Sequence, residues 1–288
     1  MTAAWRHRLA GPLLTLHRLK TAIVGENGFR ILLLHDVPAT EREACAALVD
    51  RVRRQHGVLS PEEAASWLDN PQRVPARRGK SPCLFSFDDG FVSNAEVARD
   101  ILGPAGVAAL FFVCPGLIDL APDKQPAAVA TGIFDGRIGG DELDRRLQPM
   151  SWDAIEALAA AGHTIGAHSL THRRLSAVRG EDLAREILDS GARIEARLGT
   201  PVTWFAYPFG DIDSIDAEAM RIIAGRYRYC RSGVRGANDG TTHPLALRGD
   251  HIDLTALPAW RHLALEGGLD GRYRAARQRL DALAVNCL

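Results

Sequence analysis

The chain has 288 residues, and its 35 lysine and arginine residues are balanced by 35 aspartate and glutamate residues. A disordered chain would be poorer in apolar residues than the 46% found here, and a coiled coil would hold far fewer than 27 glycines and 15 prolines. Phosphate contacts need a clustered basic surface, which zero net charge does not favour. We therefore expect a soluble globular protein that does not bind nucleic acid.

The sequence carries no export or disulfide signal that we can identify. The five cysteines are scattered and include no Cys-x-x-Cys pair, so neither a zinc ribbon nor a disulfide framework is indicated. The apolar piece Leu13–Leu16 is too short and too closely flanked by basic residues for a signal peptide. These features predict reduced thiols and a cytoplasmic location.

Residues 1–28 are expected to form an amphipathic N-terminal extension. Basic residues, among them Arg6, Arg18 and Lys20, alternate with apolar ones, and Gly11-Pro12 interrupts the pattern. Such a segment either packs as a helix on the rest of the protein or lies, through residues 1–20, on an anionic membrane surface. The second interpretation would make the protein peripheral at the inner face of the membrane.

From Phe29 onward, expected strands and helices alternate. The expected strands are Phe29–Leu34, Cys83–Phe87, Val107–Val113, His163–Ala167, Thr203–Tyr207, Tyr227–Arg231 and one near Leu245–Leu254. The expected helices include one opened by a capping box at Thr40 and Glu43, one capped by Ser60, and those over Ala95–Leu102, Ser151–Ala161, Glu181–Leu198, Ser214–Ala224 and Leu269–Val285. Because strands and helices alternate without a linker, we expect a single α/β barrel domain that spans residues 29–288, with a polar insertion at about 119–149.

Three segments at expected strand ends concentrate residues that can do chemistry, and barrel active sites form at that end. The first is Asp88-Asp89-Gly90. Adjacent residues at a strand end point in different directions, so one carboxylate could bind a metal while the other faces a substrate. Taken alone, the segment is more typical of a simple turn.

The second segment provides the partners that a metal site needs. His168 and His172 are four residues apart and could present two imidazoles to a single ion. Together with Asp89 they make three ligands, and three ligands with an open position are typical of a catalytic zinc site. His163 begins its strand and is expected at the opposite end of the barrel.

The third segment is Tyr207-Pro208-Phe209-Gly210-Asp211. In this order, the three segments resemble the motifs of the NodB-like polysaccharide deacetylases, carbohydrate esterase family four. The resemblance covers about residues 28–254 and implies a distorted (β/α) barrel of the NodB type that removes acetyl groups from glycans through a divalent metal. Zinc is the expected metal, with cobalt, nickel and iron(II) as the other candidates.

The resemblance also implies roles for individual residues. Asp88 would be the general base, Asp89, His168 and His172 the metal ligands, and the backbone N–H of Phe209 part of the oxyanion hole. Leu33 would line the pocket for the acetyl methyl group. Tyr207 and Trp204 are expected at the substrate, with Trp204 a candidate for stacking on a sugar.

Two positions depart from the commonest family pattern. The late Leu-x-His, which carries the general acid, has no clean counterpart, but Leu33-x-His35 resembles the arrangement in the poly-N-acetylglucosamine deacetylases, where this histidine precedes the two aspartates. His35 is therefore the expected acid, with His251 as its competitor. The arginine missing from the third motif is expected to be replaced by Arg248, paired with Asp88.

The expected substrate is an N-acetylated sugar or oligosaccharide, in the form of a lipid-linked or nucleotide-linked precursor of a surface glycan. Two alternatives remain open from the sequence. One is a metal-dependent deformylase or cyclic amide hydrolase with the same barrel. The other is a glycan-binding barrel without catalytic activity.

Overall fold

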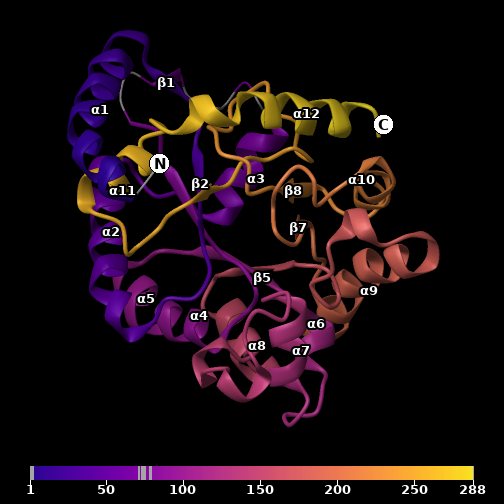
Figure 1. Ribbon diagram of the computed structural model, residues 1–288. Helices are drawn as coiled ribbons and strands as arrows, with labels where there is room; N and C mark the ends of the chain where they lie inside the picture. The colour runs from indigo at the N-terminus through magenta and orange to yellow at the C-terminus, as the bar shows by residue number, and fades with distance from the viewer. Residues whose placement is uncertain (1–2, 71, 73–75, 78–79, 288) are drawn as a thin grey trace.

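The computed structural model describes residues 3–70, 72, 76–77 and 80–287. Its centre is a parallel, seven-stranded sheet in the order β8-β7-β6-β5-β4-β2-β9, which curls into part of a barrel (Figure 1). The strands are β2 (Arg30–Leu34), β4 (Cys83–Phe87), β5 (Ala109–Val113), β6 (Thr164–Ala167), β7 (Trp204–Ala206), β8 (Tyr229–Arg231) and β9 (Asp250–His251). A distorted (β/α) barrel of the NodB type, as expected, is confirmed.

Helices surround the curled sheet (Figure 1). They are α1 (Ala3–Val24), α2 (Arg42–Gln55), α3 (Pro61–Asp69), α4 (Val92–Val97), α5 (Gly103–Ala105), α6 (Pro115–Ile118), α7 (Gln125–Gly132), α8 (Trp152–Ala160), α9 (Gly180–Leu198), α10 (Ala217–Ala224), α11 (Pro258–Leu265) and α12 (Arg274–Val285). A two-stranded ribbon joins β1 (Glu26–Asn27) to β3 (Ala76–Arg77). None of the described helices is long and apolar enough to span a bilayer.

Helix caps show where local sequence patterns were sufficient. The capping box predicted at Ser60 forms, with its hydroxyl accepting from the Glu63 N–H and the Glu63 carboxylate accepting from the Ser60 N–H. The capping box predicted at Thr40 was wrong. Residues 39–41 instead form a 3₁₀ turn, and α2 begins at Arg42.

The strands are buried on both faces, and their side chains alternate between two apolar clusters. One cluster lies between the sheet and the surrounding helices and includes Phe85, Phe111 and Phe205. The other fills the inside of the barrel and includes Ile31 and Trp204. Helix α3 packs on this inner cluster through its apolar side chains. The core therefore fixes the strand ends that carry the polar residues.

The last predicted strand is much shorter than expected. Of residues 245–254, only Asp250 and His251 pair in the sheet, next to β2. Leu247 forms an isolated parallel bridge with Arg231 and so connects the end of β8 to this segment. None of the five cysteines, all of which the structure describes, forms a disulfide; four are buried and Cys287 is partly exposed.

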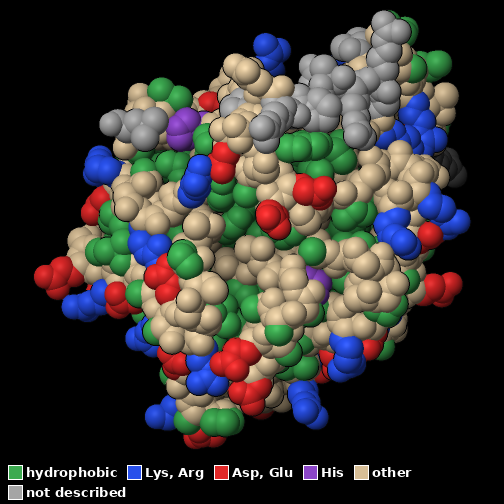
Figure 2. All heavy atoms as spheres, turned by 180° about the vertical axis from the view of Figure 1, so that it is seen from behind, with side chains coloured by type: hydrophobic (Ala, Val, Ile, Leu, Met, Phe, Trp, Pro, Cys, Tyr) green, Lys and Arg blue, Asp and Glu red, His purple; other side chains and the backbone are tan. Residues whose placement is uncertain are grey.

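The remaining segments cover the outside of the barrel. Residues 119–149 contain α7 and two 3₁₀ turns, and they share a small apolar cluster with Phe91 and Cys114. Helix α1 packs beside α11 (Figure 1). Acidic and basic side chains are interspersed over the face in Figure 2.

Candidate functional site

Polar residues from several strands meet at one edge of the sheet. His35 follows β2, Asp88 follows β4, His168 follows β6, Arg231 ends β8 and His251 ends β9. Because all these strands are parallel, their carboxyl ends lie at the same edge. The fold therefore gathers a carboxylate, three imidazoles and a guanidinium that are far apart in the sequence.

Asp89, His168 and His172 form a compact, buried cluster. Asp89 Oδ1 lies 3.5 Å from His168 Nε2 and 3.3 Å from His172 Nε2. The ligand atoms of all three residues lie within 4.8 Å of one another. The two histidines come from a tight turn rather than from one face of a helix, since Ser169 and His172 both have left-handed backbone conformations, with φ of 59° and 63°.

Backbone carbonyls orient both imidazoles of this cluster. His168 Nδ1 donates to the Ala206 carbonyl at 2.7 Å, and His172 Nδ1 donates to the Gly132 carbonyl at 3.0 Å. Carbonyl oxygens only accept, so the proton of each neutral ring lies on Nδ1 and the lone pair of Nε2 faces Asp89. Gly132 belongs to the insertion, which therefore helps to hold a residue of the site.

These three side chains fit a divalent metal ion. Asp89 Oδ1 is buried and has no hydrogen-bond partner among the described residues, so it is left with a free acceptor facing two ring nitrogens. Burial raises the pKa of the Asp89 carboxyl, but His168 and His172, when protonated and donating to it, outweigh burial and hold that pKa well below the usual range. A carboxylate with two neutral imidazoles is a donor set that zinc accepts.

Asp88 is held by a buried arginine. Its two oxygens both accept from Arg231 Nη2, at 2.5 Å for Oδ2, and both side chains are almost completely buried. Asp88 Oδ2 also lies 3.9 Å from His168 Nε2 and 4.0 Å from His35 Nε2. The carboxylate is thus fixed between the cluster of Asp89, His168 and His172 on one side and His35 on the other.

The arginine predicted for this pairing was the wrong one. Arg248 donates instead to both carboxylate oxygens of Asp281, at 2.7 and 2.8 Å, and to the Ala246 carbonyl. In the sequence, Arg231 is marked only as the last residue of an expected strand. An arginine that ends an apolar strand at the carboxyl edge of a parallel sheet was the available signal.

His35 and His251 lie side by side at the rim of the site. Their ring centroids are 5.7 Å apart, and 43% of the His35 side chain is exposed. Desolvation, followed by the charges of His35 and Arg235, lowers the pKa of His251 to about 4. His251 is therefore neutral near pH 7.

Comparison with known proteins decides which family this arrangement represents. The sequence profile of the polysaccharide deacetylase family matches residues 76–223, just over half of the chain. This chain belongs to the polysaccharide deacetylase family. The matched region contains Asp88 and all three residues of the cluster, Asp89, His168 and His172. No curated protein sequence matches the chain.

Solved structures share the fold of this polysaccharide deacetylase at low sequence identity. The deacetylase PplD from Streptococcus pyogenes, in complex with acetate, has a TM-score of 0.65 and 18% identity, covering 83% of this chain and 98% of its own. IcaB from Ammonifex degensii has a TM-score of 0.61 and 19% identity, with coverages of 84% and 98%. The BpsB deacetylase domain from Bordetella bronchiseptica has a TM-score of 0.62 and 15% identity, covering 78% of this chain and 96% of its own.

Phe209 lies next to the metal-binding cluster of the deacetylase. Its ring is 4.9 Å from that of His172, and the Arg174 guanidinium lies over its other side, 4.3 Å from the ring centroid. Its backbone has a left-handed conformation with φ of 65°. Within the described residues no group accepts a hydrogen bond from its N–H.

The residues expected at the substrate are more deeply buried than their predicted roles suggest. Trp204 is 2% exposed and packs on Tyr229 inside the barrel, with ring centroids 4.5 Å apart, so its expected stacking on a sugar was wrong. Tyr207 is also buried, and its hydroxyl donates to the Gly210 carbonyl, which fixes the turn that carries Phe209. Leu33 is buried, and in the sheet it pairs with Ser86 on β4 and His251 on β9. It lies two residues before His35 in the chain.

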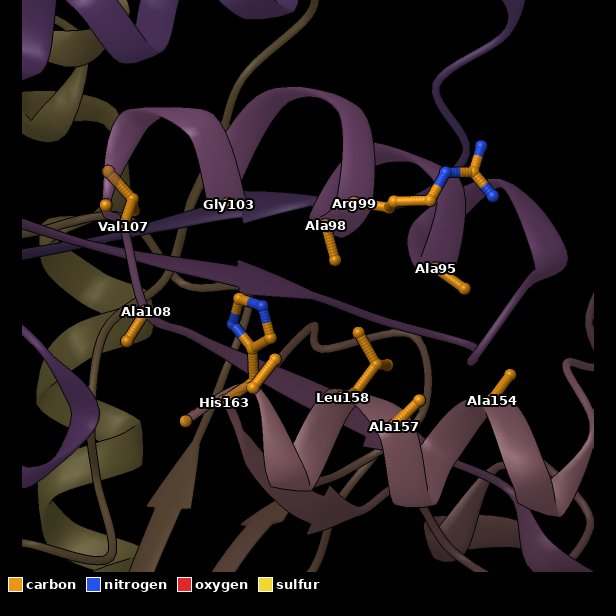
Figure 3. Close-up of a pocket in the computed structure, with 13 residues that line it drawn as sticks. Ala95, Ala98, Arg99, Gly103, Val107, Ala108, Ala154, Ala157, Leu158 and His163 are labelled. Carbon is orange, nitrogen blue, oxygen red and sulfur yellow. The ribbon is translucent and has the colours of Figure 1, made fainter.

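Two hollows that share His251 and Asp253 in their linings lie beside His35 and His251. One, of about 180 Å³, is lined by His35, and the other, of about 300 Å³, by Trp260 and Tyr273. A larger hollow of about 600 Å³ lies between α4 and α8 at the opposite end of the barrel, with His163 at its base (Figure 3). His163 Nδ1 accepts from the Ala109 N–H there, far from the metal-binding cluster.

Proposed function

We propose that this polysaccharide deacetylase removes N-acetyl groups from a glycan by metal-dependent hydrolysis, with Asp89, His168 and His172 as the metal ligands. The observation that carries the proposal is the Asp88 carboxylate, fixed by Arg231 between this cluster and His35. A divalent metal held there, for which zinc is our candidate, supplies Lewis-acid polarisation of the acetamide carbonyl and of water.

In this scheme, residues of the chain accept the proton of the attacking water and stabilise the charge that develops on the acetamide oxygen. Asp88 accepts a proton from the attacking water, because Arg231 donates to its carboxylate and holds its orientation. The N–H of Phe209 donates to the oxygen that gains charge in the transition state, a contribution of about 3 kcal/mol at comparable sites. We propose that the acetyl methyl group packs against the side chain of Leu33.

His35 donates a proton to the departing amine in this scheme. An amide nitrogen leaves poorly as an anion, so a positioned acid contributes roughly a hundredfold or more to the rate. His35 is half exposed to solvent and lies 4.0 Å from Asp88. A pKa of about 4 makes His251 a poor proton donor near pH 7, which supports His35 over its competitor.

We propose that the protein belongs to the poly-N-acetylglucosamine type of deacetylase. The support is the order of the functional segments, in which Leu33-x-His35 precedes Asp88-Asp89 and the late Leu-x-His is absent from its usual place. The two hollows at the rim provide room for more than one sugar. The substrate in this proposal is an N-acetylglucosamine oligomer or a precursor of one.

Acetate release from N-acetylglucosamine oligomers tests the function. Zinc-loaded wild-type protein should release acetate, and Asp88→Asn and His35→Ala should each lower kcat at least about a hundredfold. His251→Ala serves as the matched control and should retain most of the activity. Full activity of His35→Ala would overturn its role as acid, and formate release from formamides without acetate release would replace deacetylation with deformylation.

We also propose that residues 1–28 are an extension on a single barrel domain of residues 29–288, and that the exposed face of α1 contacts an anionic membrane. His17 and Arg18 hold α1 to Glu266 at the end of α11, and Leu14 packs inward. On the other side an apolar stripe is 38–86% exposed, consisting of Leu9, Leu13, Leu16, Leu19 and Ile23.

The charge of α1 favours a membrane over a second copy of the chain. The helix contains no aspartate or glutamate, and Lys20 lies within the same stripe by helical spacing. Two such stripes facing each other would offer Lys20 no acidic partner, whereas anionic lipids would. The cytoplasmic location expected from the sequence remains a prediction.

Sedimentation with vesicles tests the membrane contact. Vesicles containing phosphatidylserine should sediment the protein, and the double variant Leu16→Ser with Leu19→Ser should remain in the supernatant. Leu257→Ser, which changes an exposed leucine at the N-terminal end of α11, is the control and should sediment with the vesicles. Concentration-dependent dimerisation that the double variant abolishes, without vesicle binding, would assign the stripe to a second copy instead.

A further inference from the structure

We propose that the hollow beyond His251 is a subsite for a phosphate group attached to the glycan substrate, an inference that rests on the proposed deacetylase function. The hollow has a volume of about 300 Å³ and lies between the loop after β8, the end of β9, α11 and the turn before α12. Its lining combines cationic and aromatic side chains, namely Arg235, Trp260, Arg261, Arg272 and Tyr273.

The position of this hollow connects it to the reacting site. His251 and Asp253 line both this hollow and the smaller one that contains His35. The rings of His35 and His251 are 5.7 Å apart. In this proposal, a glycan whose N-acetyl group lies beside His35 extends past His251 into the second hollow.

The charges in the lining favour an anion. Within the part of the chain that the structure describes, neither Arg261 nor Arg272 forms an ion pair or a side-chain hydrogen bond, and both are at least partly exposed. The acidic residue in the lining is Asp253, whose Oδ1 already accepts from the N–H and hydroxyl of Thr255. The hollow thus presents two uncommitted guanidinium groups against one carboxylate.

Arg235 has a structural role in this hollow, because its guanidinium already donates to backbone carbonyls. It is almost completely buried, donates to the His251 and Ala264 carbonyls, and lies 3.6 Å from Asp250. These contacts tie β9 to α11 and hold the wall of the hollow in place. The shape of the subsite is therefore built into the fold, while Arg261 and Arg272 provide the charge.

The remaining lining suits a sugar phosphate better than a free ion. Trp260 and Tyr273 are partly buried and offer apolar ring faces, against which the carbon-bound hydrogens of a sugar pack. Guanidinium groups match the oxygen geometry of phosphate, and two of them complement a dianion. We therefore assign a phosphate ester, with a carboxylate-bearing sugar as the competing anion.

Binding to N-acetylglucosamine 1-phosphate, with N-acetylglucosamine as the neutral match, tests the subsite by calorimetry. The phosphate should lower Kd roughly tenfold at low salt, a difference that shrinks as salt screens the charges. The double variant Arg261→Gln with Arg272→Gln should remove the difference. Arg185→Gln, an exposed arginine on α9, is the control and should keep it.

Three results would overturn the assignment. They are equal affinity for the two sugars, a preference that survives in the double variant, and equal affinity for a carboxylate-bearing N-acetylated sugar. In the last case the subsite would recognise an anion but not specifically phosphate. Comparison with a nucleotide-linked and a lipid-linked N-acetyl sugar then identifies which carrier of the phosphate binds.

Measurements of acetate release distinguish a failure of the phosphate-subsite proposal from a failure of the proposed deacetylase function. If the neutral and phosphorylated sugars both release acetate with the same KM, the subsite is wrong and the deacetylase stands. If the phosphorylated sugar binds more tightly through Arg261 and Arg272 but no sugar releases acetate, the subsite stands and the proposed function fails.

Discussion

Arg231 and Asp88 form a buried ion pair, although 143 residues separate them in the sequence. Arg231 ends β8 and Asp88 follows β4, so the pair crosses the inside of the curled sheet rather than joining neighbouring strands. Arg231 also lies over the ring of Phe112, 5.0 Å from its centroid. The proposed base is thereby held in one orientation before a substrate binds.

Replacing Arg231 should impair both stability and catalysis. Arg231→Met leaves the buried Asp88 carboxylate without its partner, which costs about 3–5 kcal/mol in comparable buried pairs. We expect urea unfolding to show this loss and kcat for acetate release to fall at least about a hundredfold in the protein that stays folded.

Arg248→Met is the matched control, since Arg248 is also largely buried but pairs with Asp281 on α12. It should lower the free energy of unfolding and leave kcat within about threefold of wild type. Equal loss of kcat in the two variants would contradict the assignment of Arg231.

Metal content should follow the proposed ligand set. His172→Gln removes one of three ligands, and we expect its affinity for zinc to fall at least about a hundredfold. Elemental analysis after dialysis against dilute zinc measures this directly. His163→Gln, at the other end of the barrel, should keep the zinc content of wild type, and loss of zinc from that variant would contradict the assigned site.

Zinc should also stabilise the folded protein. The buried Asp89 oxygen lacks a hydrogen-bond partner among the described residues, so a bound cation compensates its charge. Because binding to the folded state alone shifts unfolding by mass action, chelation should lower Tm, and returning zinc should restore it. A zinc response of Tm that is as large in His172→Gln as in wild type would place the metal elsewhere.

Glu266 should make stability depend on pH in the acid range. Although burial raises the pKa of its carboxyl, contacts with Arg18 and Lys80 lower it to about 2. Because the pKa of Glu266 is lower in the folded state, the carboxylate stabilises the fold at pH values above its unfolded-state pKa of about 4.3. This contribution disappears as the pH falls through about 2. Partial exposure of Arg18 and Lys80 reduces the contribution to about 1–2 kcal/mol.

Glu266→Gln tests this linkage through the difference in unfolding free energy from wild type. The difference should be full at pH 6 and should shrink toward pH 2. Glu181→Gln, on an exposed part of α9, should show no such pH dependence. A constant difference between pH 6 and pH 2 would contradict the ionised state assigned to Glu266.

Gly166 should resist substitution because β6 packs tightly there. A Cβ at this position would lie 2.5 Å from the Phe112 ring and 3.1 Å from the Trp204 carbonyl oxygen. Gly166→Ala should lower the free energy of unfolding by about 1–3 kcal/mol and displace His168, two residues away, so that zinc affinity also falls. Gly11→Ala on α1, which has open space, should be neutral or slightly stabilising.

The sequence by itself determined the strand and helix succession and the short motifs within it. Apolar runs with polar residues at their ends identified β2, β4, β5 and β6, because burial on both faces needs continuous apolar strands. The Asp88-Asp89 and His168 to His172 motifs were readable for the same reason, since their spacing is local. The Ser60 capping box likewise depends on residues only three apart.

Only the tertiary structure decided which distant residues meet. The choice of Arg231 over Arg248 depends on how the curled sheet brings β8 across from β4, and no local pattern encodes that curvature. The burial of Trp204 depends on α3 packing on the inner cluster. Arg235, 200 residues after His35, joins β9 to α11 and so shapes the hollow at the rim. Contacts of such sequence separation follow from how the whole core packs, which the pattern of any one segment does not specify.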